Sequence, residues 1–392
     1  MRAPKLSGPR APRGVVLAAV FCSCLGVGLI FGFQPPLIAL VLSRTGASNF
    51  AVGAVTAASL IAVIVLGPVY PWAMVRLGLK RSVLAGVIVG AVILALMPAC
   101  TGVAPWLILR SLTGCALGLS WIASEVWMNS VSGADARGTV MGIYGTVFSI
   151  GTMAGPALLE ATGTRGWQPF AVGAAALLVT LLPLLVLRGV RSDPQVFTPM
   201  RELGGAMRAA PVIMLAALVA GLVESADLTL LPLFGIHAGF PDREALLLVT
   251  VFVAGNVVLQ APIGLLADRY GRRAVLGACA ALSGLGPLLL LPSLATPGLM
   301  WALLFIWGGT LYAFYSQGIA LLGSAFAPSA LPTANTVFVM VYCLGGVIGP
   351  SVGGMAMDVW PQRGLQVLLS AAALLLVGGL ALGALRRTTP RT

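Results

Sequence analysis

The stretch GLLADRYGRR, residues 264–273, closes a long apolar run with one acid and three arginines around a glycine. The acid, Asp268, ends the apolar run and is followed by Arg269, Arg272 and Arg273. A related stretch, PWAMVRLGLK, occupies residues 71–80, and its Gly78 precedes Gly271 by 193 residues. The chain therefore carries two copies of one unit, an apolar helix that ends in a short basic loop.

A second pair of motifs has almost the same offset. Gly155-Pro156 and Gly349-Pro350 are 194 residues apart, each inside an apolar run. A near-constant offset of half the chain length indicates a duplicated bundle, and duplicated membrane bundles commonly rock about a site at their interface near the bilayer midplane. We expect an N-terminal six-helix bundle over 1–187, a cytoplasmic linker over 188–209 and a C-terminal six-helix bundle over 210–392.

The composition indicates that both bundles lie in a membrane. The 392 residues are 59% hydrophobic and 9% charged, whereas soluble domains carry about 25% charged residues. One span needs about 20 apolar residues, and the first is too long for the apolar core of a cleavable signal peptide. The fold class is therefore all-α: a polytopic membrane protein with twelve transmembrane helices in two pseudo-symmetric bundles, expected near 15–42, 51–73, 83–100, 104–130, 139–159, 168–187, 210–235, 245–266, 275–294, 298–324, 331–357 and 364–385.

The net charge of +12 is explained by orientation. With the N-terminus in the cytoplasm, 18 of the 23 Lys and Arg fall on that side, four fall on outer loops and Arg110 lies inside a span. This asymmetry follows the positive-inside rule, so no nucleic-acid partner is expected. The chain is predicted to be a multi-pass protein of the cell inner membrane with both termini in the cytoplasm.

Residue types that support catalysis or metal binding are sparse. The six cysteines form no CxxC pair, and the one histidine, His237, falls on an outer loop. The chain has no G-x-x-x-x-G-K-[ST] stretch for binding ATP. We therefore expect no enzyme activity, no metal and no cofactor, and we expect the chain to act as a monomer in the lipid bilayer.

Four stretches carry a resemblance to a known family. GLLADRYGRR matches, residue for residue, the G-x-L-A-D-R-x-G-R-R loop signature of the major facilitator superfamily. RSLTG (110–114) resembles the fourth-span signature of many proton-coupled members. GTMAGPALLE (151–160) resembles the fifth-span signature of antiporters with Leu159-Glu160 in place of its closing Gly-Gly, and GVIGPSVGG (346–354) is a full copy in span 11. Across nearly the whole chain, the sequence looks most like the YcaD-like branch.

This resemblance implies that the basic loop is a conformational latch that does not bind substrate. In the C-terminal half the latch consists of Asp268, Arg269, Gly271, Arg272 and Arg273. In the N-terminal copy, Pro71 replaces the first glycine of the signature, Val75 the acid and Leu79 an arginine. Glu125, near the inner end of span 4, is predicted to supply the missing acid by pairing with Arg76, Lys80 or Arg137.

Two acids lie one helical turn apart in the apolar stretch VAGLVESADLTLLPLF, residues 219–234. Glu224 and Asp227, at i and i+3, share a helix face. A charged group at the bilayer centre costs about 2.5–3.5 kcal/mol, so neither acid is expected to face lipid. They should titrate as a coupled pair and are candidates for loading and releasing a proton or for binding the substrate. The alternative is a structural hydrogen bond to a neighbouring helix.

Arg110 is the third buried charge. The superfamily's cavity is lined mainly by spans 1, 4, 7 and 10, so the resemblance implies that Arg110 and both acids face one aqueous cleft. Gln34 of span 1 occupies the repeat position of Asp227 and is a further polar candidate. Arg110 is expected to steer the proton-carrying carboxylate or to bind an anionic group of the substrate. Its structural alternative is a salt bridge that fixes span 4.

These observations predict a secondary active transporter that moves a small organic solute by alternating access, coupled to protons. The span 4 signature RSLTG, which begins at Arg110, favours efflux. A proton-coupled importer or a passive facilitator of a metabolite is the alternative, and a non-transporting membrane sensor or scaffold is a third possibility. Glu160 and Arg165, at the outer end of span 5, are predicted to form a local ion pair.

Overall fold

The computed structural model describes residues 12–131, 137–187, 208–326 and 331–388, and this part of the chain contains helices and no strands. The helices run in chain order: α1 Arg13–Arg44, α2 Asn49–Leu66, α3 Tyr70–Leu77, α4 Leu79–Leu96, the 3-10 turn η1 Met97–Ala99, α5 Val103–Val131, α6 Arg137–Thr162, α7 Gln168–Val179, α8 Leu182–Val186, α10 Pro211–His237, α11 Asp242–Tyr270, α12 Arg272–Ser293, α13 Pro297–Ala325, α14 Leu331–Val359 and α15 Gly364–Thr388.

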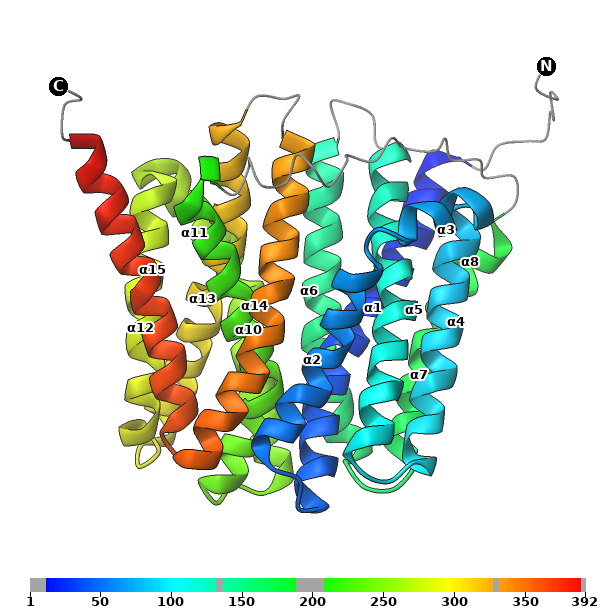
Figure 1. Cartoon of the computed structure of the whole chain (residues 1–392), viewed down its shortest axis with the longest axis horizontal. Helices are drawn as coiled ribbons and strands as arrows, with labels where there is room; N and C mark the ends of the chain where they lie inside the picture. Colours follow the sequence, from blue (N-terminus) through cyan, green and yellow to red (C-terminus); the bar gives the residue numbers. More distant parts are fainter. Residues whose placement is uncertain (1–11, 132–136, 188–207, 327–330, 389–392) are drawn as a thin grey trace.

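The helices form a bundle of twelve spans. Within the described residues, eleven helical stretches are long and apolar enough to cross a membrane. The 26-residue helix α6 runs through the bundle beside α1 and completes the predicted twelve (Figure 1). Helix α1 begins and α15 ends at the same end of the bundle (Figure 1). We call this the terminal end and the opposite one the distal end.

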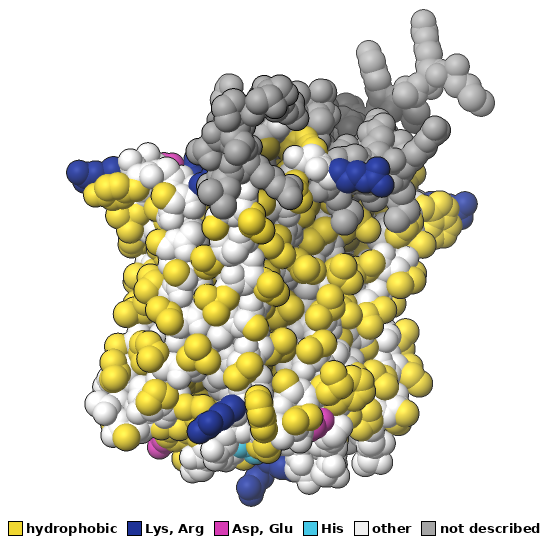
Figure 2. Space-filling model, turned by 60° about the vertical axis from the view of Figure 1, so that its left-hand side comes forward, with side chains coloured by type: hydrophobic (Ala, Val, Ile, Leu, Met, Phe, Trp, Pro, Cys, Tyr) yellow, Lys and Arg dark blue, Asp and Glu magenta, His cyan; other side chains and the backbone are white. Residues whose placement is uncertain are grey.

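The outer surface of the bundle is apolar. Figure 2 shows hydrophobic side chains over the middle of one face, with charged side chains toward the two ends. Leu265 and Leu375 are 72% and 66% exposed, which water would disfavour and lipid tails would not. The all-α membrane fold predicted from the composition is therefore confirmed.

Each half of the bundle holds six spans, from α1 to α8 and from α10 to α15. Helices α2 and α14 pack together across the two halves, as do α6 and α11. Most of the segment predicted to link the halves, residues 188–207, lies outside the described residues. The division at 188–209 therefore stays a prediction.

Glycines bring helix backbones together inside each half. A Cβ atom added to Gly155 of α6 would lie 2.5 Å from the backbone nitrogen of Phe33 in α1. In the other half, a Cβ on Gly349 of α14 would lie 2.0 Å from the carbonyl oxygen of Leu222 in α10. These distances are shorter than any real Cβ contact, so both interfaces depend on glycine.

We expect Gly155→Ala to destabilise the protein by about 1–3 kcal/mol, because the added methyl meets backbone that cannot move aside. Gly145→Ala is the matched control, since the space beside Gly145 in the same helix is open. Thermal unfolding in detergent should show a lower Tm for the first variant and no loss for the second. Equal Tm values for the two variants would contradict the close packing of α1 on α6.

Candidate functional site

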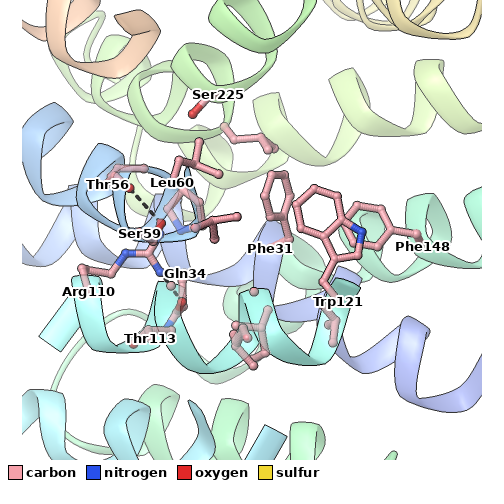
Figure 3. A pocket seen from close by; sticks show the side chains of 18 residues that line it. Phe31, Gln34, Thr56, Ser59, Leu60, Arg110, Thr113, Trp121, Phe148 and Ser225 are labelled. Atoms are coloured by element: carbon pink, nitrogen blue, oxygen red, sulfur yellow. Dashed lines mark hydrogen bonds between the residues drawn. The ribbon is translucent and has the colours of Figure 1, made fainter. Parts of the chain in front are cut away.

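One cavity lies between the two halves of the bundle. It is lined by α1, α2, α5 and α6 from one half and by α10 from the other. Polar side chains gather toward one side of it and aromatic rings toward the other (Figure 3). The labelled lining residues are Phe31, Gln34, Thr56, Ser59, Leu60, Arg110, Thr113, Trp121, Phe148 and Ser225.

Arg110 of α5 carries the positive charge of this cavity and is only 6% exposed. Its Nη1 donates a hydrogen bond to Oε1 of Gln34, and its Nη2 donates to Oγ of Ser59 at 2.9 Å. Its Nε has no partner among the described residues. Both acceptors are neutral, and no described carboxylate forms an ion pair with Arg110. The guanidinium is therefore a buried cation whose charge is not compensated.

The aromatic side of the cavity is a cluster of three rings. The Trp121 ring of α5 stacks on Phe148 of α6, with centroids 6.2 Å apart and planes 20° apart. The Phe31 ring of α1 lies 5.6 Å from the same phenylalanine. Together with Leu60 and Leu228, these rings give the cavity a mainly apolar wall.

Glu224 of α10 lines a second, smaller cavity. The Tyr342 hydroxyl of α14 donates a hydrogen bond to its Oε2 at 2.8 Å. Asn256 and Tyr312 line the same cavity, and Leu228 lines both cavities. The smaller cavity therefore adjoins the larger one at a single side chain of α10.

Asp227 is fully buried and lines neither cavity. Neither of its carboxylate oxygens has a hydrogen-bond partner among the described residues. An ionised carboxylate without a partner is costly in such surroundings. The sequence predicted one cleft for Arg110 and both acids; in this structure Arg110 and Gln34 line one cavity, Glu224 lines the adjoining one, and Asp227 is enclosed by protein.

The predicted latch lies at the terminal end of α11 and α12. Asp268 and Arg272 form an i, i+4 ion pair of 3.4 Å between exposed side chains, which contributes little to stability. Gly271 joins the two helices at a φ of 93°, a conformation that glycine adopts without strain. The Arg269 guanidinium lies 5.4 Å from the ring centroid of the tyrosine that follows it.

Glu125 does not pair with Arg76 or Lys80 as predicted. Its Oε1 accepts a hydrogen bond from Nε1 of Trp121 at 2.9 Å. The Lys80 ammonium donates to a backbone carbonyl, and the Arg76 guanidinium lies 4.6 Å from the centroid of a tryptophan ring. Both cations therefore have other partners in this state. The side chain of Arg137, the third predicted partner, lies outside the described residues.

At the distal end, ionic contacts join the two halves. Arg44 of α1 forms an ion pair with Asp242 of α11, and Thr164 donates to the same carboxylate at 3.1 Å. Arg243 pairs with Glu160 of α6 at 2.7 Å. The predicted local pair of Glu160 with Arg165 is therefore wrong, because the partner of Glu160 is 83 residues away in the other half.

A second distal contact is a helix cap supplied by the other half. The Asp358 carboxylate of α14 accepts hydrogen bonds from the backbone N–H groups of Asn49 and Phe50, at 2.8 and 2.9 Å. These groups open α2, where an anion is favoured by the helix dipole. Asn49 and Asp242 are 193 residues apart, and Thr164 and Asp358 are 194 apart. The two distal contacts are thus related by the internal repeat. The repeat offset in the sequence could have predicted one contact from the other.

Comparisons with known proteins agree with this architecture. The family model described as Major Facilitator Superfamily matches residues 16–247 and 239–392. The uncharacterized MFS-type transporter YfkF of Bacillus subtilis is 25% identical over 370 residues, which cover 90% of this chain and 92% of that protein. The uncharacterized MFS-type transporter YcaD of Escherichia coli is 25% identical over 342 residues, covering 86% and 87%.

Solved structures share the fold at low sequence identity. The nucleoside transporter NupG superposes with a TM-score of 0.76 at 15% identity, covering 94% of this chain and 98% of that one. A bacterial homologue of the human lysosomal transporter Spinster, in an inward-facing and unoccupied conformation, superposes with a TM-score of 0.72 at 16% identity, covering 95% and 96%.

Proposed function

Because the chain belongs to the Major Facilitator Superfamily, we propose that it is a proton-coupled secondary transporter that moves a small organic solute by alternating access. One observation carries this proposal. A buried cation, the buried Asp227 and the part-buried Glu224 lie at or beside cavities near the interface of two halves that pack together at one end. Ionisable groups inside a bilayer are costly, and they generally mark substrate or ion pathways. Transport, and not catalysis, is the activity that such groups support here.

Glu224 and Asp227 are the proposed proton carriers. Glu224 lines a cavity and accepts a hydrogen bond from the Tyr342 hydroxyl. Among the described residues Asp227 has no hydrogen-bond partner, and a carboxyl group with no compensating donor is best accommodated when it is neutral. A rearrangement of α10 that exposed Asp227 would let it release a proton.

The contacts at the distal end support a state that is closed on the outer side. We propose that the terminal end faces the cytoplasm of an inner-membrane protein, because 18 of 23 basic residues belong to the termini and loops expected at that end. The distal bridges of Arg44, Glu160 and Asp358 then close the outer side.

We propose that Asp268, with its arginine neighbours, latches the terminal ends of the helices in the opposite state. Asp268→Asn should lower the transport rate and leave solute affinity in the present state nearly unchanged, because the residue biases an equilibrium without touching the solute. Transport assays and binding to the purified protein measure the two effects. Lost affinity with an unchanged conformational balance would refute the latch.

A transport screen tests the proposed function. The purified protein in liposomes, with a pH difference across the membrane, is given a panel of radiolabelled organic solutes. We expect the pH difference to drive at least one solute against its own gradient, out of the compartment equivalent to the cytoplasm. Equilibration without concentration would instead favour a passive facilitator, and concentration in the opposite sense would favour an importer. Movement of no solute under any gradient would favour the sensor or scaffold.

A further inference from the structure

The charge of the larger cavity limits what can bind there. Arg110 is buried, and among the described residues its guanidinium bonds to the neutral acceptors Gln34 and Ser59 and to no carboxylate. Its Nε has no partner in the same part of the chain. Buried charges in proteins are normally paired. An anionic ligand group would supply the missing charge.

The remainder of the wall limits the shape of the ligand. Across the cavity from Arg110 lie the rings of Phe31, Trp121 and Phe148 (Figure 3). A ligand that fills the cavity would place a polar head at Arg110 and an apolar body against the rings.

We propose that the transported solute is a small amphipathic organic anion. Its carboxylate binds Arg110, and its aromatic or aliphatic body packs on Phe31, Trp121 and Phe148. The planar guanidinium suits a carboxylate because it donates two parallel hydrogen bonds. A neutral solute would leave the charge uncompensated, and a cation would be repelled. This inference rests on the proposed function and adds the substrate class.

The first test compares ligands that differ only in charge. Three probes share one ring system: 2-naphthoate, 2-naphthamide and 2-naphthylmethylammonium. Each is titrated against the purified full-length protein in detergent, and thermal stabilisation reports binding. We expect the carboxylate to bind at least about 10-fold more tightly than the amide, since hydrogen bonds to charged groups are the stronger ones. Equal or tighter binding of the amide or the ammonium compound, or no binding of the carboxylate, would overturn the proposal.

The second test places a carboxylate inside the site. Gln34→Glu keeps the size of the side chain and sets an anion beside Arg110, where it should compete with the ligand. We expect binding of 2-naphthoate to weaken at least about 10-fold, while the protein keeps its fold. Gln362→Glu, the same change at an exposed position outside the cavity, is the matched control and should keep binding. If both variants bind like the wild type, Arg110 has only a structural role.

These measurements use neither a membrane nor a proton gradient. A failure of charge selectivity in detergent would refute the substrate class and leave transport untouched. A failure of gradient-driven transport in liposomes would refute the proposed function, whatever the protein binds in detergent. The two ideas can therefore be rejected separately.

Discussion

Gly354→Val should abolish transport and leave the helices folded. A Cβ atom on Gly354 of α14 would lie 2.1 Å from the carbonyl oxygen of Asn49 in α2, and one on Gly53 of α2 would lie 1.9 Å from the carbonyl oxygen of Pro350. Both contacts join the two halves near the distal end. A clash with backbone costs about 3 kcal/mol or more when nothing can move aside, which lowers the population of the distally closed state about 100-fold or more.

Labelling of a buried residue can detect this shift directly. Val52 is fully buried and shares a helix face with Asn49, so Val52→Cys should react slowly with a membrane-impermeant maleimide in the wild-type background. Combined with Gly354→Val, it should react rapidly, because the distal ends stay apart. Gly378→Val is the control, since the space around Gly378 in α15 is open. Slow labelling and normal transport in the Gly354 variant would contradict the closure.

Neutralising both acids of α10 should abolish concentrative transport. With Glu224→Gln and Asp227→Asn together, neither group can exchange a proton, so a pH difference no longer does work on the solute. If one proton moves with each solute, a difference of one pH unit can sustain a solute concentration ratio of about 10 across the membrane. In the double variant this ratio should fall to about 1. Exchange of solute down its own gradient should survive, because a permanently neutral group resembles the protonated carrier.

The single variants should separate the two acids. Asp227→Asn is expected to have the larger effect, because Asp227 alone is fully enclosed and has no partner in the described part of the chain. Glu224→Gln keeps an acceptor for the Tyr342 hydroxyl and should perturb the structure little. Glu244→Gln, which changes an exposed acid at the start of α11, is the control for a general effect of charge. Concentrative transport should persist in this control.

The fold was predictable because its causes are periodic and local. Apolar runs of membrane length, the offset of 193–194 residues and the bias of basic residues to one side each constrain the whole chain. The backbone contacts of Gly155 and Gly349 follow from the same short motifs. Only the residue bounds differ, as where span 2 continues into the short helix α3.

The candidate site was predictable only in part. The cost of burying charge singles out Arg110, Glu224 and Asp227 in the sequence, but it does not say which way each side chain points. The rotation of α10 places Leu228 between the two cavities and turns Asp227 away from both. Because apolar residues surround α10 on every side, the sequence does not predict how the helix is rotated about its axis, and so it does not predict which acid faces a cavity.

The sequence did not predict the contacts between residues that lie far apart in the chain. Glu160 has Arg165 nearby in sequence, and yet it pairs with Arg243 across the bundle. Asp358 caps a helix that begins 309 residues earlier. Both contacts depend on how the two halves are placed relative to each other. The residues near each contact in the sequence do not determine that placement. The repeat relation between Asn49 and Asp242 was the available signal.

Proton flux gives the most direct test of coupling at α10. A pH-sensitive dye inside proteoliposomes records the proton movement caused by adding a gradient of a transported solute, with wild type, each single variant and the double variant compared at equal protein density. We predict a pH change with wild type and none with Glu224→Gln combined with Asp227→Asn, while solute exchange continues in both. Solute-driven proton movement of wild-type size in the double variant would contradict the coupling role of the two acids.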